Sequence, residues 1–113
     1  MEHPGTYLYC IIPCREERIF AGVTPIGNPL GPVYAVRQDG LAAVVSDSTM
    51  TEYVSTRANL LAHERVVERV MQEYPLLPVR FGTVADSQAP TIAVQKLLAR
   101  RSTEFHGLLG EME

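Results

Sequence analysis

The stretch Thr6-Tyr-Leu-Tyr-Cys-Ile-Ile-Pro13 carries the strongest β-strand signal in this 113-residue chain. Its β-branched and aromatic residues favour an extended backbone. Apolar side chains fill successive positions instead of alternate ones, which is typical of a strand that is covered on both faces. We therefore expect this strand at the centre of a sheet, with the other elements arranged around it.

A β-hairpin is predicted next along the chain. Residues 24–32 contain three prolines and two glycines, so this stretch has few backbone donors and is expected to be a loop. The apolar stretches 33–37 and 41–46 follow, and Asp39-Gly40 stands between them. That dipeptide favours a tight type I′ turn, because both of its residues tolerate a positive φ.

A helix is predicted after the polar residues 48–55, with Ser55 or Thr56 as its N-cap. Pro75 is expected to end it. Its apolar residues recur at spacings of three and four, and the stripe expected to face the core consists of Leu60, Leu61, Val67, Val70, Met71 and Tyr74.

The helix is followed by a short predicted strand. The apolar residues Leu77, Val79 and Phe81 alternate with Pro78 and Arg80, as in a strand with one buried face. Pro78 favours a position at the edge of the sheet. A second helix is expected over residues 89–109, with Asp86 or Ser87 as its cap. The inner face of this helix is assigned to Val94, Leu97, Leu98, Arg101, Phe105, Leu108 and Leu109, in which Arg101 is a mismatch.

The order of elements, three strands, a helix, a strand and a helix, predicts an α+β fold. We expect a mainly antiparallel four-stranded sheet with the two helices covering one face. A length of 113 residues suits one domain, since two domains of half that size would each lack a good core.

Composition narrows the class of protein. Apolar residues make up 46% of the chain and charged residues 20%, which excludes a disordered chain. The net charge of −3 argues against binding to nucleic acid or to an anionic membrane, and the longest apolar run is too short to cross a bilayer. The two cysteines, Cys10 and Cys14, are expected to be buried or idle thiols in a reducing cytoplasm.

The search for catalytic and metal-binding motifs finds none that is complete. His63-Glu64 begins the zinc motif H-E-x-x-H, but Val67 occupies the place of the second histidine. We therefore interpret His63 as a solvated or half-buried helix residue. The glycines of residues 22–31 do not form a phosphate-binding motif, and no serine lies in a nucleophile elbow. We expect no catalytic residues, no bound cofactor and no metal.

Arg80 is the most informative single charge, because it lies within the apolar run 76–82. A guanidinium there has to reach water or a carboxylate, for which Asp47 and Glu64 are candidates. One interpretation places Arg80 on the outer face of the strand or in a structural ion pair, and the other lets it hold a partner protein.

Five blocks of the sequence together resemble the N-terminal part of the gas vesicle proteins of the GvpL/GvpF family. They occur in the order of the family: Tyr7-Leu-Tyr-Cys-Ile-Ile-Pro13, Val33-Tyr-Ala-Val-Arg37, Gly40-Leu-Ala-Ala-Val-Val-Ser-Asp47, Asn59-Leu-Leu-Ala-His-Glu-Arg-Val66 and Leu77-Pro-Val-Arg-Phe-Gly-Thr83. The last two blocks are the most specific.

This resemblance implies a non-enzymatic accessory or structural protein of gas vesicle assembly, the process that supplies buoyancy. Its expected partners are the small hydrophobic shell protein GvpA and other gas vesicle accessory proteins, in the cytoplasm and at the vesicle shell. The fold implied is a ferredoxin-like variant. Because family members continue into a C-terminal domain, residues 1–113 are expected to be the first domain without the second, short by about one strand.

Two places are predicted to contact GvpA. One is the edge strand with Leu77, Val79, Arg80 and Phe81, and the other is the first strand through Tyr7 and Tyr9. An exposed sheet edge of this kind could also join two copies of the chain. The alternative function is a small-ligand-binding regulatory module with a ferredoxin-like sheet, and an enzyme is the third choice.

Overall fold

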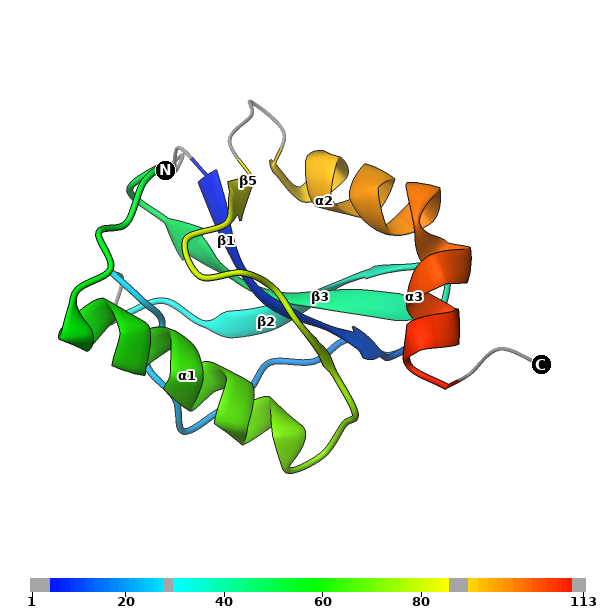
Figure 1. Ribbon diagram of the computed structural model, residues 1–113, viewed down its shortest axis with the longest axis horizontal. Coiled ribbons are helices and arrows are strands. Elements are labelled where there is room, and N and C mark those ends of the chain that lie inside the picture. The colour runs from blue at the N-terminus through cyan, green and yellow to red at the C-terminus, as the bar shows by residue number, and fades with distance from the viewer. Residues whose placement is uncertain (1–4, 28–29, 86–89, 111–113) are drawn as a thin grey trace.

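The computed structural model describes residues 5–27, 30–85 and 90–110, which form one antiparallel sheet with helices packed on it (Figure 1). Strand β1 (Gly5–Pro13) is central. It pairs with β3 (Leu41–Ser48) on one side, and on the other side with β4 (Leu77–Pro78) and β5 (Val84–Ala85). Strand β2 (Val33–Gln38) pairs with β3, so the order is β2-β3-β1-β4, with β5 also on β1. The predicted α+β class and antiparallel sheet are confirmed.

A bulge in β1 sets which side chains face which layer. Leu8 pairs with Val45 and Cys10 pairs with Val44, so Tyr9 is the additional residue. As a result Tyr9 and Cys10 both belong to the cluster on one face of the sheet, whereas the neighbouring Leu8 belongs to the cluster on the other.

The β2–β3 hairpin has the turn that its sequence predicts. Asp39 has φ of 56° and Gly40 has φ of 78°, as a type I′ turn requires at both central positions. The outer edge of β2 is partly covered by the preceding loop, because the Phe20 N–H donates to the Val33 carbonyl (2.8 Å) and the Ala35 N–H donates to the Arg18 carbonyl (3.0 Å). This edge is therefore not an open template for another strand.

Helix α1 (Arg57–Met71) begins at the predicted N-cap, since the Thr56 side chain accepts a hydrogen bond from the Asn59 N–H. It packs on the tyrosine face of β1 through His63, Val66 and Val70. The predicted inner stripe is wrong in part, because Leu60 is 42% exposed and Met71 is 60% exposed. The tyrosines of β1 and loop residues such as Phe20 already fill this face, so only a narrow seam of the helix is buried.

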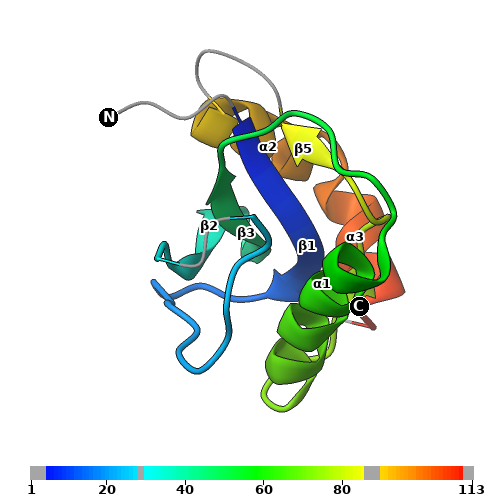
Figure 2. The same cartoon turned by 90° about the vertical axis from the view of Figure 1, so that its left-hand side faces the viewer.

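Helices α2 (Pro90–Arg100) and α3 (Ser102–Leu108) lie on the opposite face, so that the strands pass between them and α1 (Figures 1 and 2). Val94, Leu98 and Phe105 pack there with Leu8 and Ile11 of β1. The expectation that both helices cover one face is therefore wrong. The reason is that β1 is apolar on both faces, and each face needs its own cover.

The predicted helix over residues 89–109 is interrupted at Arg101, which has φ of −118° and ψ of 18°. The break lets Arg101 point away from the core. Its guanidinium pairs with Glu104 (2.8 Å) at the surface and lies 4.7 Å from the centre of the Phe105 ring. The predicted caps Asp86 and Ser87, and Ala89, lie outside the described residues.

The single edge strand predicted around residues 77–81 is divided into β4 and β5, which makes five strands where four are expected. Each of these edge strands has only two residues. Within the described ranges, no helix combines the length and the apolar character that a membrane span requires.

The orientation of α1 predicts that truncating a buried apolar residue of the helix destabilises the fold more than truncating an exposed one. Val66→Ala should lower the free energy of unfolding by about 2 kcal/mol, because Val66 is fully buried and its truncation leaves a cavity. Leu60→Ala, the matched control on the same helix, should cost about 0.5 kcal/mol or less. Urea unfolding followed by circular dichroism measures both values. Equal losses of unfolding free energy would contradict this orientation of α1.

Candidate functional site

Between β4 and β5 the backbone turns away from the edge of the sheet after Val79 and pairs with β1 again at Thr83. The Val79 N–H donates to the Tyr9 carbonyl (3.0 Å), and further along the Leu8 N–H donates to the Thr83 carbonyl (3.0 Å). Between these two contacts the chain folds back on itself, because both the N–H and the hydroxyl of Thr83 donate to the Arg80 carbonyl. Residues 80–83 are called the 80–83 turn below.

Glycine is required within this turn. Gly82 has φ of +85°, a conformation that side chains with a Cβ atom rarely adopt. Its N–H points inward and donates to the Tyr7 hydroxyl at 3.0 Å. The turn is therefore anchored to the centre of the sheet by a side chain of β1.

The Tyr7 hydroxyl also lies 2.8 Å from Nδ1 of His63 on α1. The ring of Phe81, from the 80–83 turn, lies against the His63 ring with the two centres 5.9 Å apart. Three segments that are far apart in the sequence, namely β1, α1 and the turn, thus meet at His63. We call Tyr7, His63, Phe81 and Gly82 the histidine junction.

The histidine junction is uncharged at neutral pH. Burial raises the pKa of Tyr7 to about 12, although the hydrogen bond from Gly82 opposes this shift. Burial also lowers the pKa of His63, although the nearby Glu64 carboxylate acts in the opposite direction. The neighbouring Tyr9 hydroxyl bonds to Ser46 Oγ (2.8 Å) and accepts from the Ile26 N–H (2.9 Å), so it is satisfied as well.

The six residues that were predicted to contact a partner differ in their exposure to solvent. Tyr7 and Tyr9 are 0% exposed, so the prediction that they touch a partner directly is corrected: they support the surface from below. Arg80 is exposed, and Phe81 is half-buried over His63. Leu77 and Val79 are half-buried and pack against the core on the α2 side.

Arg80 is exposed to solvent and lies just outside the strands, and both of its interpretations allow this exposure. Among the described residues, no carboxylate forms an ion pair with its guanidinium. Asp47, one of the two predicted partners, accepts a hydrogen bond from the Tyr34 hydroxyl (2.6 Å). Arg80 thus presents a cation on the surface of the 80–83 turn.

Three residues of the helix stripe that was predicted to face the core are instead partly exposed. Leu60, Val67 and Met71, called the α1 stripe, are spaced seven and four residues apart and so share one side of the helix. Leu60 and Val67 are the helical neighbours of His63 at i−3 and i+4. After α1 the chain reverses, and Met71 lines the same surface hollow as Leu76. The spacing of these residues is visible in the sequence, but their exposure is not.

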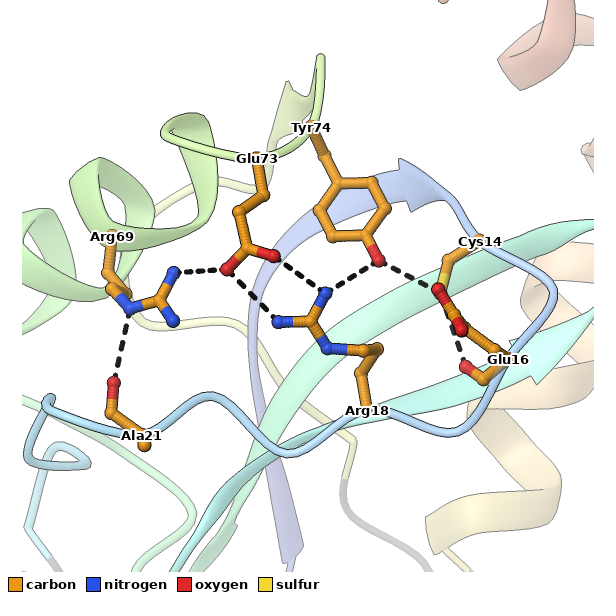
Figure 3. Close-up of polar contacts among 7 residues, drawn as sticks. All are labelled: Cys14, Glu16, Arg18, Ala21, Arg69, Glu73 and Tyr74. Atoms are coloured by element: carbon orange, nitrogen blue, oxygen red, sulfur yellow. Dashed lines mark hydrogen bonds and ion pairs between the residues drawn. The ribbon is translucent and has the colours of Figure 1, made fainter.

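A separate polar cluster fastens the β1–β2 loop to the end of α1 (Figure 3). Both oxygens of Glu73 accept from the Arg18 guanidinium, at 2.9 and 3.0 Å, and Arg69 adds a contact at 2.6 Å. Arg69 also donates to the Ala21 carbonyl (3.1 Å), and Arg18 donates to the Tyr74 hydroxyl (2.8 Å). These hydrogen bonds hold the pKa of Glu73 down at about 2, with Arg18 as the larger cause.

The two cysteines do not form a reactive site in this arrangement. Burial raises the pKa of the Cys10 thiol to about 12, so Cys10 stays protonated at neutral pH. The Cys14 thiol donates to the Glu16 carbonyl (3.2 Å) (Figure 3). In the part of the chain that the structure describes, no group of three or more His, Cys, Asp or Glu side chains could hold a metal ion.

The hollow between β2 and α2 is the place where a small ligand would be sought. Arg15, Arg37 and Gln95 line it. Arg37 already donates to the Arg15 carbonyl (3.0 Å) and lies 3.9 Å from Glu17, while Gln95 donates to the Arg37 carbonyl (3.1 Å). The side chains of Arg37 and Gln95 are thus engaged by other groups of the protein.

Comparison with known proteins gives a consistent answer. The family model described as "Gas vesicle synthesis protein GvpL/GvpF" matches residues 5–113. Gas vesicle protein F of Nostoc sp. is 33% identical over 113 residues, which cover 96% of this chain and 45% of that protein. Gas vesicle protein L1 of Halobacterium salinarum is 31% identical over 87 residues, or 73% of this chain and 31% of that protein.

Solved structures agree with the sequence relatives. The crystal structure of gas vesicle protein GvpF from Microcystis aeruginosa is similar with a TM-score of 0.75 and 29% identity, covering 96% of this chain and 43% of that one. The crystal structure of GvpF from Anabaena sp. has the same TM-score at 27% identity, and the match covers 96% of this chain and 43% of that one. The chain therefore spans less than half the length of these relatives.

The Glu73 cluster predicts a response to acid. A carboxyl whose pKa is lowered from 4.5 to about 2 stabilises the fold above pH 4.5, and this stabilisation is lost as the pH falls toward 2. Glu73→Gln should therefore be less stable than the wild type at pH 7, and the difference should shrink at pH 3 and in high salt, because Glu73 is in contact with solvent.

Urea unfolding midpoints at both pH values and at low and high salt measure this effect. The matched control is Glu68→Gln, an exposed carboxylate on α1, the helix that ends two residues before Glu73. A Glu73→Gln variant that loses no more stability than the control at pH 7 would contradict a stabilising role for the cluster.

Proposed function

The chain belongs to the GvpL/GvpF family of gas vesicle synthesis proteins, and from this we propose that it is a non-enzymatic accessory protein of gas vesicle assembly. We further propose that it binds the hydrophobic shell protein GvpA, in the cytoplasm and at the vesicle shell, together with other accessory proteins of the vesicle. Because the relatives are more than twice as long, the proposal concerns what this part of such a protein contributes.

The observation that supports GvpA binding is one surface with a mixed character. The α1 stripe is apolar and partly exposed, and it flanks His63, against whose ring Phe81 of the 80–83 turn packs. The exposed cation Arg80 precedes Phe81 in the turn. We call the α1 stripe together with Arg80 and Phe81 the stripe–turn surface. A protein that meets a very hydrophobic partner before assembly needs such an apolar patch framed by charge.

The contact is proposed to use side chains and not the addition of a strand. The outer edge of β2 is partly covered by the loop before it, and β4 and β5 have two residues each. Such short edges give little template for an added strand, whether from GvpA or from a second copy of the chain. We therefore do not extend the proposal to a dimer formed through a sheet edge.

The absence of catalysis is proposed from the state of the groups that could perform it. Cys10 is buried and protonated, and the His63 ring is engaged by Tyr7 and Phe81. Arg18 and Arg69 both pair with the Glu73 carboxylate. Each of these groups has a structural contact that accounts for its position.

A binding experiment tests the stripe–turn surface. The double variant Leu60→Ser, Met71→Ser should retain about tenfold less GvpA than the wild type, as expected for a loss of about 1.4 kcal/mol of binding free energy. The measurement is the amount of co-expressed GvpA that copurifies with the tagged chain, for variants that remain folded by circular dichroism.

The matched control is the double variant Ile92→Ser, Leu108→Ser. Ile92 is 53% exposed and Leu108 is 63% exposed, and both lie on α2 and α3, on the other side of the sheet. The control should bind like the wild type. Equal binding by all three proteins, or a loss only in the control, would reject this surface as the GvpA site.

A further inference from the structure

The histidine junction links the proposed binding surface to the protonation of one buried residue. We propose that His63, acting through the Tyr7 hydroxyl, is a positioning residue that keeps the 80–83 turn docked while its imidazole is neutral and releases the turn when it is protonated. The effect on GvpA binding rests on the proposed function, whereas the docking of the turn does not.

The direction of each hydrogen bond at the junction follows from what each group can donate. The Gly82 N–H can only donate, so the Tyr7 oxygen accepts from it at 3.0 Å. Among the described residues, the acceptor that the Tyr7 proton reaches is Nδ1 of His63 at 2.8 Å. Nδ1 must therefore carry the lone pair, and the proton of the neutral imidazole is on Nε2.

Protonation of His63 makes this arrangement untenable. Nδ1–H becomes a donor, so the Tyr7 oxygen faces two donors while its own proton loses the acceptor. Tyr7 is fully buried, and a buried hydroxyl proton without an acceptor is costly, as is a buried charge. The charged ring also lies edge-on against Phe81, which belongs to the turn, so the unfavourable charge arises at the contact between α1 and the turn.

The groups around His63 give the new charge little compensation. From β1 it is faced by the uncharged Tyr7 and Tyr9, and Tyr53, from the segment before α1, lies against Tyr7. Phe81 faces it from the turn. On its own helix Glu64 is the charged neighbour, but Glu64 is exposed and its pull on the pKa of His63 is smaller than the opposing effect of burial.

Releasing the turn need not unfold the sheet, because the turn is bounded by independent contacts. The Val79 N–H bonds to the Tyr9 carbonyl and the Leu8 N–H bonds to the Thr83 carbonyl, and neither bond involves His63. Only the anchoring of Gly82 depends on the junction. Acid should therefore loosen residues 80–83 before it affects the flanking strands.

Amide hydrogen exchange measured by NMR on the full chain tests this inference. When the pH is lowered from 8 to 5, the protection factor of the Gly82 amide should fall at least about tenfold after correction for the intrinsic exchange rate. The protection factors of the Leu8 and Val79 amides should stay the same. The midpoint should coincide with the titration of the His63 imidazole and lie below 6.5, because burial lowers the pKa of His63.

Two variants separate positioning from a merely structural role. His63→Asn offers an amide oxygen near the place of Nδ1 and does not titrate, so Gly82 should stay protected down to pH 5. Tyr7→Phe removes the shared hydroxyl, so Gly82 should be unprotected at every pH. His106→Asn is the control, because that histidine bonds to the Asp39 carbonyl at the other end of the sheet and should leave the Gly82 profile unchanged.

Each outcome decides the proposal. Gly82 protection that does not follow His63 protonation, or that persists in Tyr7→Phe, would overturn it. If the exchange results hold, wild-type GvpA retention should fall at least threefold from pH 7.5 to pH 5.5, and His63→Asn should abolish that fall. Loss of GvpA binding at every pH, with the exchange results intact, would reject the proposed function and leave the positioning role of His63 supported.

Discussion

The burial of β1 on both faces is the constraint on which the rest of this structure depends. Its residues are apolar at successive positions, so neither face can be left to water. One face is covered by α1 and the β1–β2 loop, and the other by α2 and α3 (Figure 2). The bulge at Tyr9 adjusts this division, since it turns Tyr9 and Cys10 to the same side. The helices therefore lie where the side chains of β1 require cover.

The second constraint is that the tyrosines of β1 bring hydroxyl groups into the core. Each hydroxyl needs partners there, and each accepts a hydrogen bond from the backbone of a segment outside β1. Tyr9 accepts from the N–H of Ile26 in the long loop, and Tyr7 accepts from the N–H of Gly82 in the 80–83 turn. The central strand thus positions two surface segments through side-chain hydrogen bonds, which connects the core directly to the surface proposed to act in gas vesicle assembly.

Helix α1 contains more apolar residues than the core can accept. His63, Val66 and Val70 occupy the contact with β1, and the α1 stripe stays partly in water. A polar cluster with Glu73 at its centre secures the other end of the helix (Figure 3). Together these features give a helix that is fastened at its C-terminal end and carries a partly exposed apolar side.

The sequence by itself determined the α+β class, the β2–β3 turn at Asp39-Gly40, an N-cap at Ser55 or Thr56 and the resemblance to the family, because each depends on neighbouring residues. Only the tertiary structure decided that the helices cover opposite faces, that Tyr7 is fully buried and that His63 is buried against the turn. The physical reason is that periodicity reveals which residues avoid water, whereas their actual burial depends on how distant segments divide the available surface.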